Sequence, residues 1–176
     1  HNFRAGYGAG LSAVQNDYTV MIGQQAGASA SGSRESVMIG GDAGNSSLIS
    51  MSGIMIGNGA GQYASGVDFS VILGVDAGKS SYVSDDVVMI GNNAGKQASG
   101  CDYSTMIGWQ AGINALNNYS SVAIGFYAGN QSSTNDYSIS IGQHNSQYAS
   151  NLDEMVNLGY WAGYRMYNST SGVAIG

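Results

Sequence analysis

The sequence predicts an all-β fold, a parallel β-solenoid (a β-roll or β-helix) with coils of 17 residues. Three observations lead to this class. A short apolar strand that ends in glycine recurs every 17 residues along the whole chain. A second glycine, usually preceded by alanine, follows the first by four residues. No insertion interrupts this period, so each coil must stack on the next in the same way.

The first element of each coil is the apolar strand, as in the run Val20-Met21-Ile22-Gly23. We number the coil from Val20 as position 1, so positions 1 and 3 share one strand face and position 2 lies on the other. Val, Ile and Leu dominate positions 1 and 3 and suit a pleated strand. Glycine at position 4 can adopt a positive φ and turn a corner. The position 4 glycines are Gly6, Gly23, Gly40, Gly57, Gly74, Gly91, Gly108, Gly125, Gly142, Gly159 and Gly176.

The rest of the coil contains small and corner-forming residues. Alanine at position 7 and Ala or Ser at position 11 indicate a thin coil whose walls are close together. Positions 15 to 17 often read Asp-aromatic-Ser, and we expect these side chains to bond nearby backbone N–H groups at a corner. We therefore expect two or three short strands per coil, without helix. About ten coils spaced by ~4.8 Å predict a rod of roughly 50 Å.

Composition excludes several classes of protein. Only 9% of the 176 residues are charged, and 43% are hydrophobic, which argues against a disordered chain. The net charge of −6 and the five Lys and Arg residues argue against nucleic acid as a partner. Cys101 is the only cysteine, so no intrachain disulfide can form. No apolar run reaches 18 residues, so we expect no membrane insertion.

Position 2 predicts an oligomer interface. Because it points away from positions 1 and 3, we expect it on the outside of the coil, where it would form an apolar stripe. An exposed stripe of this kind needs a partner, most simply further copies of the chain around an axis, or else a flanking segment. The stripe consists of Met21, Met38, Met55, Ile72, Met89 and Met106.

The strand Ser121-Val122-Ala123-Ile124-Gly125, echoed in the last five residues, resembles the head repeat of trimeric autotransporter adhesins, and related repeats occur in phage tail fibres. The resemblance covers the entire chain in period and strand motif. It implies a parallel β-roll, a homotrimer, and a role at a cell or virion surface. Adhesin heads usually have shorter repeats, which favours the tail fibre.

We therefore expect residues 1–176 to be a single solenoid array of about ten repeats, a fragment of a longer fibre. The expected function is structural and non-enzymatic: a tail fibre segment on the virion surface that attaches to a host cell-surface glycan or other receptor. One alternative is the head domain of a bacterial trimeric adhesin on the bacterial cell surface. The other is a polysaccharide-degrading tailspike.

Aromatic residues collect at positions 5 and 6 of the later coils. Their rings can stack on sugars, so we consider them candidates for glycan binding. The alternative is that they pack between chains or against an adjoining domain. The candidates, with one histidine in the same column, are Trp109, Phe126, Tyr127, His144, Tyr160 and Trp161.

We expect no catalytic residue, metal site or cofactor. His144 has no second His or Cys at ligand spacing and no clear nucleophile to activate. The Asp column at position 15 repeats with the coil, which favours corner capping over cation binding or catalysis. One coil has Asn145-Ser146 where Ala-Gly is expected, which predicts either a local bulge or a contact site beside His144.

Overall fold

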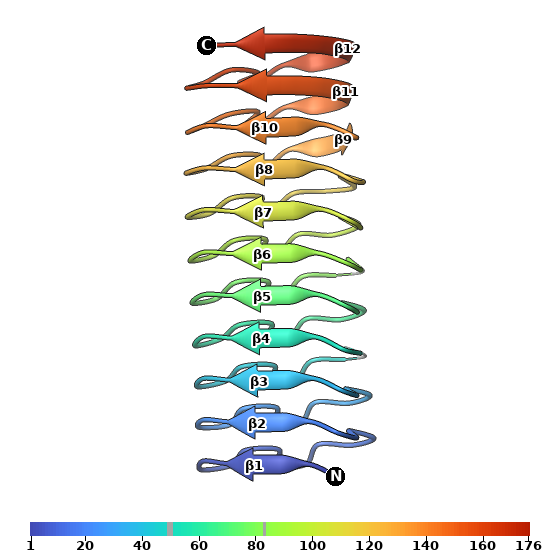
Figure 1. Cartoon of the computed structure of the whole chain (residues 1–176), viewed down its shortest axis with the longest axis vertical. Helices are drawn as coiled ribbons and strands as arrows, with labels where there is room; N and C mark the ends of the chain where they lie inside the picture. Colours follow the sequence, from blue (N-terminus) through green and yellow to red (C-terminus); the bar gives the residue numbers. More distant parts are fainter. Residues whose placement is uncertain (49–50, 83) are drawn as a thin grey trace.

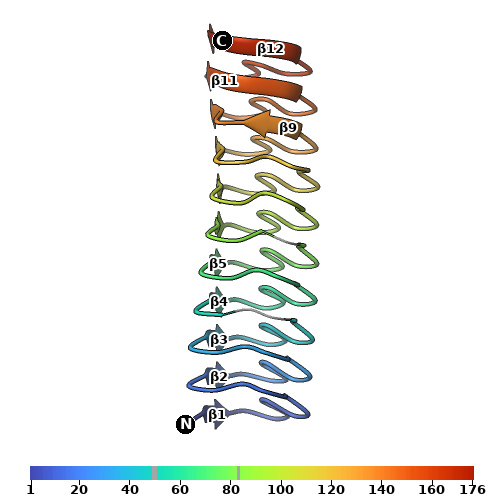
Figure 2. The same ribbon diagram turned by 90° about the vertical axis from the view of Figure 1, so that its right-hand side faces the viewer.

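The computed structural model describes residues 1–48, 51–82 and 84–176. The chain forms one straight column of stacked coils, with the two termini at opposite ends (Figure 1; Figure 2). Twelve strands belong to one sheet whose pairs are all parallel, and the described residues contain no helix. The predicted all-β parallel solenoid is therefore confirmed.

Each coil up to β8 contributes one three-residue strand to this sheet, and each strand residue pairs with the residue 17 positions further on, as Val20 does with Val37. The order along the rod follows the chain from β1 to β8 and then β10, β11 and β12, while β9 pairs with β11. The strands are β1 Phe3–Ala5, β2 Val20–Ile22, β3 Val37–Ile39, β4 Ile54–Ile56, β5 Val71–Leu73, β6 Val88–Ile90, β7 Thr105–Ile107, β8 Val122–Ile124, β9 Ser133–Asp136, β10 Ile139–Ile141, β11 Ser150–Leu158 and β12 Tyr167–Ile175.

The return side of the coil has less strand than expected. In most coils it contributes only a single bridge at position 12, such as that between Leu48 and Ser65. Residues with positive φ at positions 6, 10 and 16, such as Gln25, Ser29 and Glu35, turn the chain too often for a longer strand. Among the described residues, extended strands on this side occur in the C-terminal coils, in β9, β11 and β12.

The prediction that position 2 lies outside the coil is wrong. All six side chains predicted as an oligomer interface are buried within a single chain, with 0–3% of their surface exposed: Met21, Met38, Met55, Ile72, Met89 and Met106. The coil is so thin that one long side chain from the strand fills it, together with buried alanines at positions 7 and 11. Flexible methionine suits such an irregular space. The outer face of the strand is therefore formed by positions 1 and 3.

Position 4 requires glycine for two reasons. Gly23 has a φ of 130°, which side-chain-bearing residues rarely adopt. A Cβ on Gly23 would also collide with the carbonyl oxygen of Gly40 in the next coil. The corner thus brings neighbouring backbones into close approach, which explains why this glycine recurs in every coil.

Polar side chains at the other corner bond the backbone of a neighbouring coil. The Asp102 carboxylate accepts a hydrogen bond from the Asp85 N–H at 3.0 Å, and Asp136 accepts one from the Tyr119 N–H at 3.0 Å. Corner capping by the Asp column is thus confirmed at these positions, although the partner is one coil away and not close in sequence. Serine at position 17 acts similarly, since Ser104 Oγ accepts a hydrogen bond from the Ser121 N–H at 3.1 Å. These bonds satisfy N–H groups that would otherwise lack partners.

The irregular pair at 145 and 146 lies in the core. The Asn145 amide nitrogen lies 2.9–3.1 Å from the carbonyl oxygens of Ile141, Asn157 and Gly159, and its two N–H groups are shared among these three acceptors. Ser146 Oγ lies 2.6 Å from Ser140 Oγ and accepts a hydrogen bond from the Asn157 amide at 2.8 Å. Since both Asn145 and Ser146 are buried, they are part of a polar core and not of a contact surface.

Candidate functional site

The outer face of the sheet is a continuous aliphatic surface. It consists of positions 1 and 3 of the strands, which are half-buried or exposed throughout. For example, 39% of the surface of Ile54 and 38% of that of Ile56 are accessible. From β2 to β10 every residue at these positions is Val, Ile or Leu, apart from Thr105. We call this surface the aliphatic face, and it runs along the column of arrows in Figure 1.

The structure brings the six predicted glycan-binding candidates together at one edge of this face. They follow the glycines that end β7, β8, β10 and β11, and we call them the aromatic ledge: Trp109, Phe126, Tyr127, His144, Tyr160 and Trp161. Ring contacts join them from coil to coil. The Trp109 and Phe126 rings stack with centroids 4.7 Å apart, and those of Tyr127 and His144 stack at 5.1 Å. Neighbouring coils therefore hold the rings in one connected row.

Ring orientation differs along the ledge. The two stacked pairs are nearly parallel, with interplanar angles of 14°, so each ring covers one face of its partner. At the C-terminal end Trp161 is tilted by 44° from Tyr160 and by 54° from His144. Trp161 is also 43% exposed. Packing within the chain thus orients the rings, but it leaves ring surface accessible along the whole ledge, since Phe126 in the stacked part is 42% exposed.

The ledge residues at position 6 adopt an unfavourable backbone conformation. Tyr127, His144 and Trp161 have φ values of 58°, 55° and 61°. Bulky residues rarely occupy this left-handed region, at a cost of about 1 kcal/mol each. Gly59 and Asn93, which suit this conformation better, occupy the same position in earlier coils. The left-handed backbone conformation at position 6 is therefore not the reason that aromatic residues occur there in the later coils.

Three residues outside the predicted set extend the ledge: Tyr148, Tyr164 and Arg165. Tyr148 lies next to Tyr164, with ring centroids 6.0 Å apart, and Tyr164 lies 4.5 Å from Trp161. The Arg165 guanidinium carbon lies 5.6 Å from the Tyr148 ring centroid and 5.3 Å from that of Tyr164. These residues occupy positions 9 and 10, which vary between coils, so no periodic signal marks them.

A second aromatic cluster lies at the opposite edge of the sheet. Tyr103, Tyr119 and Tyr137 occupy the corner before the strand, and their rings meet edge to face at 5.4 and 5.6 Å. All three are exposed. The Asp-aromatic-Ser pattern contains Tyr103 and Tyr137, but the contact through Tyr119 depends on the stacking of coils.

His144 is oriented by its own coil. Its Nδ1 lies 2.8 Å from Oε1 of the buried Gln147, three residues further on. Among residues 1–48, 51–82 and 84–176, no three His, Cys, Asp or Glu side chains group closely enough to hold a metal ion. The prediction that His144 is neither catalytic nor a metal ligand remains a prediction.

Cys101 is buried within the coil. Burial raises the pKa of its thiol from 9.0 to about 11. The thiolate is the reactive form of cysteine, so Cys101 is a poor nucleophile at neutral pH.

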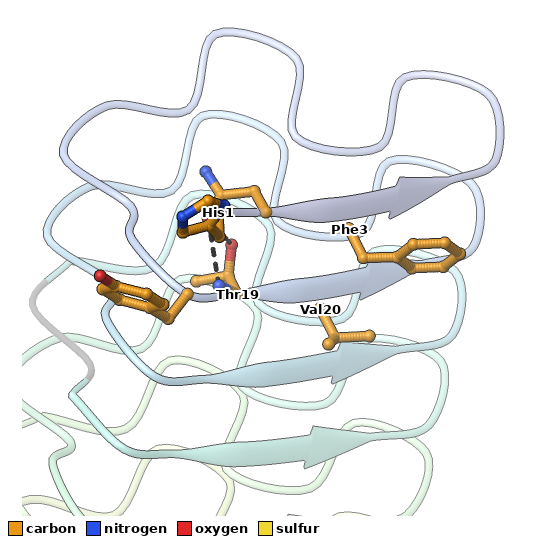
Figure 3. A pocket seen from close by; sticks show the side chains of 6 residues that line it. His1, Phe3, Thr19 and Val20 are labelled. Carbon is orange, nitrogen blue, oxygen red and sulfur yellow. Dashed lines mark hydrogen bonds between the residues drawn. The ribbon is translucent and has the colours of Figure 1, made fainter.

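An open hollow of about 480 Å³ lies at the N-terminal end of the rod (Figure 3). Its lining includes His1, Phe3, Tyr18 and Val20. Across it, Asn2 Oδ1 accepts hydrogen bonds from both the backbone N–H and the hydroxyl of Thr19, each at 3.1 Å. Since these polar atoms already bond each other, they form part of the coil structure and offer no evident binding site.

The fold and these surfaces define a repeat protein of the parallel β-solenoid class. A scan against models of protein families and a search of curated proteins found no match to this chain. Within the part of the chain that the structure describes, no helix has the length and hydropathy needed to cross a membrane.

Proposed function

We propose that this chain is a structural, non-enzymatic segment of a phage tail fibre that assembles as a homotrimer and attaches the virion to a host surface. The observation that carries this proposal is the aliphatic face. It repeats over the whole rod, it is accessible in a single chain, and its side chains lack charge. A surface of this kind is typical of an interface.

The aliphatic face by itself is smaller than a typical stable interface, so assembly also needs contacts from residues beside it. The rod is roughly 50 Å long, and each three-residue strand spans about 10 Å across it, so the aliphatic face has an area of roughly 500 Å². This area is smaller than the ~800 Å² per partner of a typical stable interface. It lies within the range of the largest apolar patches on monomers, which are often functional. In a three-fold arrangement each chain contacts two neighbours, and cyclic symmetry places equivalent coils of the three chains at the same height along the axis. Residues beside the face add further contact area.

The aromatic ledge supports the attachment role. It lies beside the aliphatic face, on a rigid row of coils that spans Trp109 to Trp161, and such a row suits an extended surface polymer. Several copies of the ledge in one fibre would add avidity. The corner carboxylates support a non-enzymatic role, because Asp102 and Asp136 cap backbone N–H groups in a pattern that recurs between coils.

Oligomeric state tests the assembly. We expect the purified chain to be a trimer in multi-angle light scattering, and the double variant Ile56→Lys, Ile90→Lys to be a folded monomer. Ser29→Lys, Gln97→Lys adds the same charge at exposed sites at position 10, away from the aliphatic face and its edges, and should remain a trimer. A monomeric parent chain, or a trimeric double variant, would contradict the proposal.

Attachment is tested separately with fluorescent protein and candidate host cells. Trp161→Ala should reduce binding several-fold, with the trimer and its melting temperature retained. Gln24→Ala, at position 5 of an early coil, is the control. Normal attachment of the Trp161 variant would place the binding surface elsewhere on the rod.

A bacterial adhesin head is the second candidate, because the strand Val122-Ala123-Ile124-Gly125 carries the closest resemblance to that group. Any flanking sequence encoded with this chain separates the two: a membrane-anchor barrel indicates an adhesin, whereas a virion-attachment or chaperone domain indicates a fibre.

A further inference from the structure

We infer that the C-terminal end of the aromatic ledge binds a sugar that carries a carboxylate, with Arg165 as the residue that holds the anion. The inference rests on the proposed attachment function and adds the chemical class of the ligand. The site consists of Tyr148, Tyr160, Trp161, Tyr164 and Arg165, which we call the Arg165 site.

Two aromatic rings hold the Arg165 guanidinium. Its central carbon lies 5.6 Å from the Tyr148 ring centroid and 5.3 Å from that of Tyr164, which is within the range of a cation–π contact. The backbone is also tied to the preceding coil, since the Arg165 N–H donates to the Gln147 carbonyl oxygen at 3.0 Å. The side chain is therefore restrained although it is exposed.

Arg165 has no acidic partner among residues 1–48, 51–82 and 84–176. The ion pairs of these residues join Lys79 and Lys96 to Asp76, in earlier coils. An exposed, oriented guanidinium without a carboxylate can donate two parallel hydrogen bonds to a carboxylate of a ligand.

The surroundings favour an anion despite the net charge of −6. Positions 5 to 10 of the last four coils contain no Asp or Glu, and Arg165 is their only Lys or Arg; these segments are 109–114, 126–131, 143–148 and 160–165. Asp153 and Glu154 lie within β11 at positions 15 and 16 of the coil, ahead of positions 1 to 3, and so at the opposite edge of the aliphatic face from the ledge. Screening over about 8 Å at physiological salt weakens repulsion from that distant edge.

The adjacent rings suit a sugar better than an isolated anion. The centroid of the Trp161 ring lies 4.5 Å from that of Tyr164 and 5.7 Å from that of Tyr160, with interplanar angles of 38° and 44°, and 43% of Trp161 is exposed. An apolar ring surface beside a guanidinium matches a pyranose that bears a carboxylate, in which the C–H face stacks and the carboxylate pairs with Arg165. Uronic acids and sialic acids share this chemistry.

A panel of immobilised glycans tests the inference. It contains oligomers of galacturonate and of sialate, the methyl esters of the same oligomers, and O-sulfated neutral glycans. We expect the trimer to bind at least one carboxylate oligomer, and to bind its methyl ester at least tenfold more weakly. Raising the sodium chloride concentration should weaken binding to the acid and leave binding to the ester unchanged.

Matched variants assign the effect to Arg165. Arg165→Gln should weaken binding to the carboxylate oligomer by about tenfold or more, in line with the loss of a charge-assisted pair. Arg165→Lys should give an intermediate loss, because it keeps the charge and loses the planar fork. Arg34→Gln removes the same charge from an exposed arginine beside Glu35 and should bind like the parent chain.

The outcomes separate this inference from the proposed function. Equal binding to acid and ester, or unchanged binding by Arg165→Gln, would overturn the carboxylate assignment while attachment through Trp161 could still hold. Binding confined to sulfated glycans would show that the anion is a sulfate and would also overturn it. Attachment that persists in Trp161→Ala would instead defeat the proposed use of the ledge.

Discussion

The thioether of Met21 occupies the space that a side chain on Gly27 would need. A Cβ on Gly27 would lie 2.6 Å from the Met21 sulfur, which is much closer than real carbon atoms approach. This contact links position 2 of the strand to position 8 of the same coil and explains the second glycine of the repeat. Where position 2 is the short Ser140, position 8 can be Ser146, and the two hydroxyls lie 2.6 Å apart.

The first prediction concerns this link between positions 2 and 8. Gly27→Ala should lower the free energy of unfolding by about 2–4 kcal/mol, through overpacking against Met21 added to the cost of a left-handed alanine. Gly129→Ala is the matched control: its φ of 61° is close to the 62° of Gly27, but its nearest neighbour is the Ala123 Cβ at 3.0 Å. It should cost less, about 1–2 kcal/mol, because the left-handed backbone penalty is the same but the added Cβ meets one tight contact with Ala123, whereas at Gly27 it meets the Met21 sulfur and methyl group and the Met38 sulfur. Urea unfolding followed by circular dichroism measures both, and equal losses would contradict the steric account.

The second prediction separates the core from the outer face. Met38→Asp places a carboxylate where 0% of the side chain is exposed, so it should destabilise the fold by more than about 3 kcal/mol. Ile56→Asp, on the aliphatic face, should preserve the circular dichroism spectrum of the separated chain. If the Met38→Asp chain instead stayed folded and only failed to assemble, position 2 would be part of an interface between chains.

The third prediction concerns the polar core. Asn145→Ala removes the donor for the carbonyl oxygens of Ile141, Asn157 and Gly159 and should destabilise the protein by about 1–3 kcal/mol. Asn92→Ala makes the same change on the surface and should alter stability by less than about 0.5 kcal/mol. Thermal unfolding of the two variants provides the comparison. An Asn145 variant as stable as the parent would show that these carbonyl groups find other partners.

The fourth prediction is a pH dependence from Cys101. Its pKa is about 11 in the folded chain and 9.0 for the free side chain, so between these values the unfolded state releases a proton that the folded state keeps. Stability from this group is complete below about pH 9 and falls as the pH rises towards about 11. The difference in unfolding free energy between the parent chain and Cys101→Ala should therefore change only in this window. Because both proteins contain the same tyrosines, tyrosine ionisation cancels in this difference, and a flat difference would contradict the raised pKa.

Much of the fold could be predicted because its determinants are local and repeat with the coil. The unbroken spacing of residues such as Gly23 and Gly40 requires identical coils stacked in register, and the glycines identify the corner. The candidates of the aromatic ledge could also be predicted to share one edge, because residues 17 positions apart must stack. Tyr148 and Arg165 could not be selected in this way, since their roles arise from contacts between variable positions of adjacent coils.

The sequence by itself determined the period, the parallel stacking and the column in which each side chain lies. Only the tertiary structure decided which strand face is inside, because alternation along three residues is the same whichever face is buried. The deciding quantity is the width of the coil: with alanine at positions 7 and 11 and glycine at position 8, the interior accepts one long side chain such as Met89, but not the branched pair Val88 and Ile90. Those two side chains therefore face outwards, and the accessible apolar surface is formed by positions 1 and 3 and not by position 2 as expected from the sequence.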